Sequence, residues 1–429
     1  MRYYSTRNKN ESFSFAAASL AGLAPDGGLF VPEEVPQLKT AAISSLGKMA
    51  YPEIAFEIIA PWVEDDIPKA VLSDMLQSAY PFSAPLVNAG DRFVLELFHG
   101  PTAAFKDFGA RFMARAFSYL RRGEDKPLKI LVATSGDTGG AVADGFFGVE
   151  GITVTVLYPK GRVSSLQERQ IAGLGGNTSA IAVEGSFDDC QRLVKQAFAD
   201  TDLKKKFVLS SANSINISRL IPQAVYYASA AGGAPEGTFS VPSGNFGNLT
   251  AGLYAWKMGA PIGKFIAATN INKTVPDYLE SGSYEERLSK ATLSNAMDVG
   301  APSNFERMAA HFSWDQMRDI IMGASVSDSE TKETISGVFA RCGYYLDPHS
   351  AVAWKAADKL REAGKLAKEK TLAIFSTAHP AKFAETVEPL TGPVPVPPSL
   401  QKAMERTVKA KTIPTDPEAL KDALSKENL

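Results

Sequence analysis

The stretch HGPTAAFKDFG, residues 99–109, joins a short apolar run to a helix-like segment. The run before it, residues 93–98, has the length and composition of a buried strand, and residues 107–122 are predicted to form a helix. Lys106 stands at the junction, where ligands of open α/β sheets bind. The pattern therefore predicts a lysine that reaches into a cleft, with a surface lysine after a turn as the alternative interpretation.

Strands and helices alternate along most of the chain. Further strands are predicted at residues 129–134, 153–158, 179–183, 207–210, 239–241, 265–269 and 371–375. Helices are predicted at residues 138–147, 165–174, 188–198, 218–230, 249–258, 303–312, 329–341, 350–362 and 381–387. Short apolar strands between helices of this kind are typical of an α/β fold with parallel sheets. Residues 33–90 are predicted to be mostly helical.

The composition is that of an ordinary globular protein. The chain has 429 residues, of which 45% are hydrophobic and 21% charged, and its formal net charge is -2. This near-neutral balance provides no basic surface for nucleic acid. The apolar runs are shorter than the roughly 18 residues that a membrane-spanning helix needs. Two cysteines, Cys190 and Cys342, cannot build a disulfide framework and favour a reducing, cytoplasmic environment.

Two glycine-rich loops follow predicted strands. In PSGNFGN, residues 242–248, the glycines allow a tight turn, and amides at the start of the next helix favour a phosphate. A turn without a ligand is the alternative. In SGDTGG, residues 135–140, the hydroxyls suit a carboxylate or a phosphate. Asp137 does not suit an anion unless it faces a cationic or protonated group, and a simple helix cap is the alternative.

Two further clusters carry polar groups after strands. SANSINISR, residues 211–219, places Arg219 beside amide and hydroxyl side chains, which is typical of an anion clamp, although a solvated loop is equally compatible. Thr377 follows the strand predicted at 371–375, so its hydroxyl can bond a cofactor atom. The four histidines are widely spaced and form no zinc-binding pattern, so no metal site is predicted.

Together, these motifs resemble those of the threonine synthases, which are pyridoxal-phosphate enzymes of fold type II. The resemblance runs nearly end to end, and the long amino-terminal segment is similar to that of the bacterial and fungal branch. It rests on YYST at residues 3–6, GLAPDGGL at 22–29, HGPTAAFKDFG at 99–109, SGDTGGA at 135–141, NSIN at 213–216 with Arg219, PSGNFGN at 242–248, DPH at 347–349 and STAHPAKF at 376–383.

The resemblance implies a tryptophan synthase β-like fold, with two open parallel-sheet domains and a helical amino-terminal segment. Residues 1–90 would form that segment and pack on the large domain. Residues 91–108 and 207–392 would form the large, cofactor-binding domain, and residues 109–206 the smaller one. Residues 393–429 would form a peripheral tail of one or two helices, weakly tied to the core.

The resemblance also implies the conversion of O-phospho-L-homoserine and water to L-threonine and phosphate, by a monomer or a homodimer. Lys106 would hold pyridoxal phosphate covalently and shuttle protons. The remaining cofactor contacts would come from Phe105, Asp137, Ser243, Gly244, Asn245, Phe246, Gly247, Asn248 and Thr377. The substrate contacts would come from Ser135, Thr138, Asn213, Ser214 and Arg219.

One departure from the family pattern concerns Asp137. Many relatives carry Asn at this position, next to the phenolic oxygen of the cofactor, so an acid there must share a proton or point away. Two rival functions also stay open from the sequence. One is a pyridoxal-phosphate phospholyase or dehydratase that releases 2-oxobutyrate. The other is a non-catalytic ligand-binding protein of the same fold, against which the intact lysine motif argues.

Overall fold

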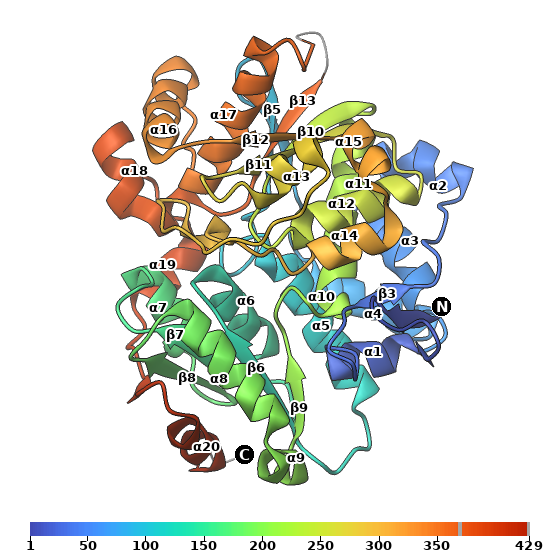
Figure 1. The fold of residues 1–429 in the computed structure, drawn as a ribbon, viewed down its shortest axis with the longest axis vertical. Coiled ribbons are helices and arrows are strands. Elements are labelled where there is room, and N and C mark those ends of the chain that lie inside the picture. Colours follow the sequence, from blue (N-terminus) through green and yellow to red (C-terminus); the bar gives the residue numbers. More distant parts are fainter. Residues whose placement is uncertain (368–370, 427–429) are drawn as a thin grey trace.

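Two parallel sheets lie at the centres of the upper and lower lobes of the molecule (Figure 1). This computed structural model describes residues 1–367 and 371–426. Parts of two predictions, residues 368–370 in the large domain and 427–429 in the tail, lie outside these ranges. The expected α/β fold with two parallel-sheet domains is confirmed.

The larger sheet has six strands in the order β12-β11-β10-β13-β5-β4. Neighbouring strands run parallel except at one edge, where β4 pairs antiparallel with β5. The two central strands, β10 and β13, are buried along their whole length, as expected for strands covered on both faces. The strands are β4 (Leu86–Asn88), β5 (Phe93–Glu96), β10 (Gly237–Pro242), β11 (Ile262–Thr269), β12 (Ile321–Ser325) and β13 (Leu372–Ser376).

Helices cover both faces of the larger sheet because successive side chains of a strand point to opposite faces. Ile266 and Ala268 of β11 belong to the hydrophobic cluster beneath α17, whereas Phe265 and Ala267 pack with α11 and α12 on the other face. The helices of this domain are α10 (Ile217–Leu220), α11 (Ala224–Gly233), α12 (Gly247–Lys257), α13 (Thr274–Ser281), α14 (Phe305–His311), α15 (Trp314–Ile320), α16 (Asp328–Cys342), α17 (Pro348–Glu362) and α18 (Ala384–Thr391).

The smaller sheet has five parallel strands in the order β14-β8-β7-β6-β9. Its strands are β6 (Leu128–Ala133), β7 (Ile152–Pro159), β8 (Thr178–Val183), β9 (Val208–Ser211) and β14 (Lys411–Ile413). Its helices are α6 (Asp137–Phe146), α7 (Ser165–Ala172), α8 (Phe187–Ala199) and α9 (Thr201–Lys206). α5 (Lys106–Leu120) joins the two lobes, because its side chains belong to the hydrophobic cores of both.

Two domain assignments need correction. The strand predicted at 207–210 was assigned to the large domain, but β9 pairs with β6 in the smaller sheet. The tail was expected to be helical and weakly tied to the core, but β14 adds a parallel strand to β8. α19 (Pro398–Met404) packs near α7, and α20 (Pro417–Lys426) packs on α8. Strand partners far away in the sequence decide both placements, so local pattern could not identify them.

Several elements differ locally from the predictions. The helix predicted at 218–230 is divided into α10, a 3-10 turn at Ile221–Gln223 and α11, because Pro222 lacks the N–H that a continuous α-helix needs. β4 and β12 were not predicted as strands. The 3-10 turn at Pro380–Phe383 (η4) precedes α18 where one helix was expected at 381–387.

The amino-terminal segment packs on the large domain. A small antiparallel sheet of β1 (Tyr3–Ser5), β2 (Ser12–Phe13) and β3 (Phe30–Pro32) lies beside α1 (Phe15–Ala21), α2 (Thr40–Ser45), α3 (Tyr51–Val63) and α4 (Lys69–Ala79). Ile58 of α3 and Tyr227 of α11 share one hydrophobic cluster. Gln37 also donates a hydrogen bond of 2.7 Å to the carbonyl of Lys257.

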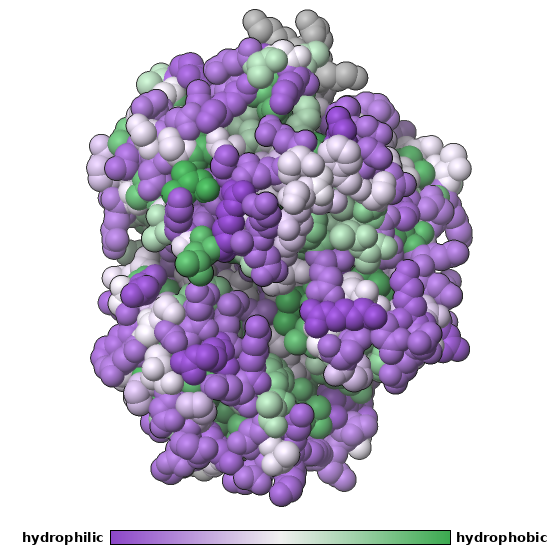
Figure 2. All heavy atoms as spheres, viewed as in Figure 1, coloured by the Kyte–Doolittle hydropathy of each residue, from purple (hydrophilic) through white to green (hydrophobic). Residues whose placement is uncertain are grey.

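Figure 2 shows one face on which hydrophilic side chains predominate and hydrophobic ones form small scattered groups. Among the helices of residues 1–367 and 371–426, none combines the length and the apolar character needed to cross a membrane.

Candidate active site

Loops from both lobes enclose a cavity of about 550 Å³. They follow the carboxyl ends of β5, β10 and β13 in the larger sheet and of β6 and β9 in the smaller one, as expected for open α/β sheets. The structure brings all the sequence-predicted site residues into the wall of this cavity. They are Phe105, Lys106, Ser135, Asp137, Thr138, Asn213, Ser214, Arg219, Ser243, Gly244, Asn245, Phe246, Gly247, Asn248 and Thr377.

Lys106 is the first residue of α5, and the loop of residues 97–105 joins it to β5. The turn before it puts Ala103 in the left-handed region, at a φ of 53°. The amide of Phe105 donates a hydrogen bond of 2.9 Å to the carbonyl of Thr377. This bond joins the loop that carries Lys106, residues 97–106 (the lysine loop), to the end of β13. The Nζ of Lys106 lies 4.6 Å from the centre of the Phe105 ring.

The surroundings of Lys106 raise the fraction of its amine that is neutral. Burial lowers the pKa of this amine to about 8, the charge of Asp137 opposes the shift, and the charges of Arg219 and Lys382 add to it. A free lysine has a pKa of about 10.4. The fraction of neutral amine near neutral pH is therefore much larger for Lys106 than for an exposed lysine.

The loop between β10 and α12 is prepared for an anion. Phe246 has a φ of 58°, and no side chain of the described residues caps α12, so amides of its first turn are open to a ligand. A Cβ on Gly244 would lie 2.6 Å from the carbonyl oxygen of Ala296, so the loop needs glycine there. The buried Nδ2 of Asn248 has no hydrogen-bond partner within the described chain, which leaves a donor for a ligand.

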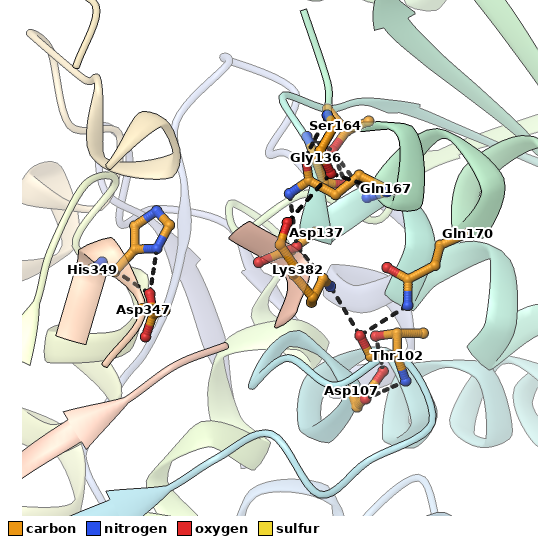
Figure 3. A network of polar contacts seen from close by, with 12 residues as sticks. Thr102, Asp107, Gly136, Asp137, Ser164, Gln167, Gln170, Asp347, His349 and Lys382 are labelled. Atoms are coloured by element: carbon orange, nitrogen blue, oxygen red, sulfur yellow. Dashed lines mark hydrogen bonds and ion pairs between the residues drawn. The ribbon is translucent and has the colours of Figure 1, made fainter. Parts of the chain in front are cut away.

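The loop between β6 and α6 is built differently. Its Thr134 Oγ1 accepts hydrogen bonds of 3.0 Å from the amides of Gly136 and Gly139. The Asp137 carboxylate is buried, and its Oδ1 lies 2.7 Å from the Nζ of Lys382 and 3.0 Å from the Nε2 of Gln167 (Figure 3). Burial alone would raise the pKa of Asp137, but these two partners hold it below its usual value.

The predicted anion clamp contains a buried guanidinium. Arg219 is 2% exposed, its Nη1 donates to the carbonyl of Ala212, and its Nε is buried without a hydrogen-bond partner among the described residues. Burial lowers the pKa of Arg219 to about 10, which leaves it charged at neutral pH. Asn213 donates a hydrogen bond of 2.8 Å to the carbonyl of Ala133, which fixes it between β9 and β6.

Sequence reasoning missed residues that support this wall. Gln167 and Lys382 hold Asp137, and buried Arg307 donates to the carbonyl of Ser214. His349 also lines the cavity, with its Nδ1 2.7 Å from a carboxylate oxygen of Asp347, although its DPH motif received no role. Lys382 lies in the quoted motif STAHPAKF, but spacing alone cannot pair it with a residue more than two hundred positions away.

Three family models together match nearly the whole chain. The family model for the threonine synthase N terminus matches residues 2–80. The model for pyridoxal-phosphate dependent enzymes matches residues 85–377, and the model for the threonine synthase C-terminal region matches residues 350–424. The chain belongs to the threonine synthase family. The expected family is thereby confirmed, together with its place among the pyridoxal-phosphate-dependent enzymes.

Individual threonine synthases are similar over nearly their full length. The protein from Haemophilus influenzae is 45% identical over 412 residues, which cover 94% of each chain. The crystal structure from Escherichia coli is 42% identical and covers 100% of both chains, with a TM-score of 0.92. The structure from Brucella melitensis, described as pyridoxal-phosphate-bound, is 37% identical, covers 99% of this chain and 98% of its own, and has a TM-score of 0.91.

The residues of the cavity fit the cofactor of this family. A phosphate suits the open amides and the unpartnered Asn248 donor at the start of α12. An aldehyde suits the amine of Lys106, whose lowered pKa favours the neutral, nucleophilic form. Both groups line the same cavity, so one molecule can meet both.

Proposed function

We propose that this chain has threonine synthase activity and converts O-phospho-L-homoserine and water to L-threonine and phosphate. The observation that carries the proposal is the meeting of the Lys106 amine, the open loop at 243–248 and the buried Arg219 in one cavity. Membership of the threonine synthase family over the length of the chain supports it.

The chain would bind pyridoxal phosphate at two points of the cofactor, its aldehyde carbon and its phosphate. Lys106 would bind it covalently, and the amides and side chains of residues 243–248 would hold its phosphate. Thr377, which lies at the end of β13 and is 5% exposed, would offer its hydroxyl to the ring nitrogen. When bound, pyridoxal phosphate supplies an electron sink for negative charge at the α carbon of an amino acid.

The reaction requires protons to leave the α and β carbons while the bond between the γ carbon and the phosphate oxygen breaks. A hydroxyl from water then adds at the β carbon, the γ carbon gains a proton, and the α carbon regains the proton that it lost. Once the amine of the substrate has replaced it on the cofactor, Lys106 in its neutral form can take the α proton as a general base. Asn213, Ser214 and Arg219 would bind the phosphate group, because a guanidinium and neutral donors suit its charge. Ser135 and Thr138 would bind the substrate carboxylate.

A product assay tests the proposal. The purified chain is given O-phospho-L-homoserine, and threonine, 2-oxobutyrate and phosphate are measured together. We expect threonine and phosphate in equal amounts. Phosphate with 2-oxobutyrate and without threonine would support the phospholyase instead. Failure to release phosphate, in a protein without cofactor absorbance, would support a non-catalytic binding protein.

A labelling experiment tests the role of Lys106 separately. Borohydride reduction of the purified protein, followed by peptide mass mapping, is expected to place the cofactor on Lys106. A label on a different lysine would refute the assignment. This measurement does not depend on which product the enzyme forms.

Two coarser expectations accompany the proposal. A cytoplasmic location is supported by the free thiols of Cys190 and Cys342, which suit a reducing compartment. For assembly we expect a monomer or a homodimer, which the elution volume and light scattering of the purified protein would distinguish.

A further inference from the structure

Lys382 is a buried cation that the proposed reaction does not use. It belongs to the 3-10 turn η4, five residues after Thr377, and its side chain is 0% exposed. Lysine is rarely buried completely unless its charge is paired, since desolvation of an ammonium is costly. Lys382 therefore needs partners whose interactions compensate for this desolvation, and the identity of these partners indicates the role of Lys382.

Its two partners come from different lobes. Nζ lies 2.7 Å from Oδ1 of Asp137, on α6 in the smaller lobe, and donates a hydrogen bond of 2.9 Å to the carbonyl of Thr102 (Figure 3). Gln167 of α7 donates to the same oxygen of Asp137, at 3.0 Å. Lys382 thereby connects the lysine loop of the large domain to two helices of the small one.

A second branch of the network leads to the residue next to Lys106. The carbonyl of Thr102 also accepts a hydrogen bond of 3.0 Å from Gln170. The hydroxyl and the amide of Thr102 donate to the carboxylate of Asp107, at 2.6 and 2.9 Å. Burial raises the pKa of Asp107 to about 6, although these two bonds oppose the shift. The loop that carries Lys106 is thus held from both domains.

The ion pair between Lys382 and Asp137 also affects the charge and the position of the Asp137 carboxylate at the cavity. Asp137 lines the cavity, while Lys382 lies behind it and outside the wall formed by the described residues. Both contacts to Asp137 engage Oδ1, and they help to hold the pKa of this carboxyl below its usual value, so it is ionised at neutral pH. Removing one member of a buried ion pair leaves an uncompensated charge, which is far more disruptive than removing both.

We propose that Lys382 is a positioning residue for the proposed reaction: it fixes the Asp137 carboxylate in the cavity wall and balances its charge beside the amine of Lys106. The proposal rests on the proposed function only in taking Lys106 as the reacting group. The charged groups that bear on this amine are Asp137 of α6, Arg219 of α10 and Lys382 of η4. Asp137 stabilises the protonated amine, and the two cations oppose it.

Competitive labelling of Lys106 tests the charge balance directly. The full-length chain is freed of cofactor with hydroxylamine, treated with trace acetic anhydride across a pH series, and analysed for acetylation of the Lys106 peptide. Neutral amine is the reactive form, so the labelling rate below the pKa reports its fraction. Circular dichroism at each step shows whether the variant is folded.

The two single variants should shift labelling in opposite directions. Lys382→Met removes a repelling cation and frees Asp137, so labelling at a fixed pH below the pKa should fall by roughly tenfold. Asp137→Asn removes an attracting anion, so labelling should rise by a similar factor. The double variant should return to within about twofold of the original chain, because both charges are gone. Lys382→Arg keeps the charge and should restore most of the original rate.

Lys359 offers a matched control. Its Nζ also contacts one carboxylate oxygen, of Glu330 at 2.7 Å, and one main-chain carbonyl, of Ser325 at 2.8 Å. It lies on α17 and outside the described wall of the cavity. Lys359→Met should therefore leave the labelling of Lys106 unchanged, even where it lowers the melting temperature.

Several results would overturn the proposal. Folded single variants that leave Lys106 labelling unchanged, or shift it in the same direction, would show that the pair has only a structural role. If Lys382→Met does not fold, Asp137→Asn is compared with the double variant instead. The proposal then requires that Lys106 labelling rises in Asp137→Asn and that adding Lys382→Met cancels this rise. The labelling needs neither cofactor nor substrate, so failure of the proposed function would appear separately, in the product assay and the borohydride label.

Discussion

Two loops in the wall of the cavity have similar local structures but different electrostatic roles. Residues 242–248 follow β10 and lead into α12, and residues 134–140 follow β6 and lead into α6. Both are glycine-rich, both end a buried strand, and both begin a helix whose amino terminus faces the cavity. From the sequence, each could have been an anion site.

The two loops differ in the groups that accept hydrogen bonds from their backbone amides. In the first loop, the described residues provide no side-chain cap, and Asn248 has a spare buried donor. In the second, Thr134 takes two amides, and the carboxylate of Asp137 already lies in the first turn of the helix. The comparison teaches that the backbone amides of a glycine-rich turn are open to an external anion only where the chain supplies no acceptor of its own, while the hydroxyls of such a turn can still bind a ligand. The predictions below test this division.

Lys106→Ala should have the largest effect, because the two loops converge on this amine. We expect threonine formation to fall by at least about a thousandfold, within the range attributed to a general acid or base. The variant should lose covalent cofactor but keep its circular dichroism spectrum. A variant that retains more than a tenth of the original rate would show that another group moves the protons.

Arg219→Ala should lower substrate use by about 10- to 150-fold, since a charged hydrogen bond contributes roughly 1.5–3 kcal/mol. The absorbance of the bound cofactor should stay the same, because the 243–248 loop and not Arg219 is assigned to the cofactor. The measurement is kcat/KM together with the spectrum. Equal loss of cofactor and activity would mean that Arg219 is structural and that the division of anion sites is wrong.

A pair of glycine substitutions compares the loops directly. In Gly244→Ala, the new Cβ would lie 2.6 Å from the carbonyl oxygen of Ala296, so the loop must move and cofactor affinity should fall about tenfold. In Gly139→Ala, the Cβ would lie 2.6 Å from Cγ2 of Thr134 and 2.7 Å from Cγ1 of Val156, so overpacking should destabilise the fold by about 1–3 kcal/mol. Cofactor titration and chemical denaturation measure the two effects.

The same two glycine variants can also show that the two loops do not differ as described. If Gly139→Ala weakens cofactor binding as much as Gly244→Ala does at equal stability, the second loop also holds the cofactor phosphate. The original chain, measured under the same conditions, provides the reference for both variants.

Thr377→Val should have the smallest effect. It removes one neutral hydroxyl and nearly preserves the volume at the end of β13, and a neutral hydrogen bond contributes about 0.5–1.5 kcal/mol. We expect a two- to tenfold loss of activity at about that energy and a shift in cofactor absorbance. An unchanged spectrum would mean that Thr377 does not touch the ring.

Local sequence was sufficient for the parts of the fold that depend on neighbouring residues. Each predicted strand is present within a few residues, because short apolar runs between turn residues must be buried in a parallel sheet. The helix predicted at 218–230 was interrupted by Pro222, whose missing N–H could have been recognised in the sequence. β4 and β12 carry weaker patterns, and partner strands determine that they extend a sheet edge.

The sequence by itself determined the family, the two-sheet architecture and the residues that meet in the cavity. The alternation of strands and helices follows from local patterns, since a strand, a glycine turn and a helix start are encoded within about ten residues, while the two-sheet architecture and the set of site residues follow from the resemblance to a family that these motifs carry. The tertiary structure alone decided that β9 and β14 join the smaller sheet and that Lys382 neutralises Asp137. Such contacts join residues far apart in the chain, and their energy depends on burial and distance, which no local pattern contains.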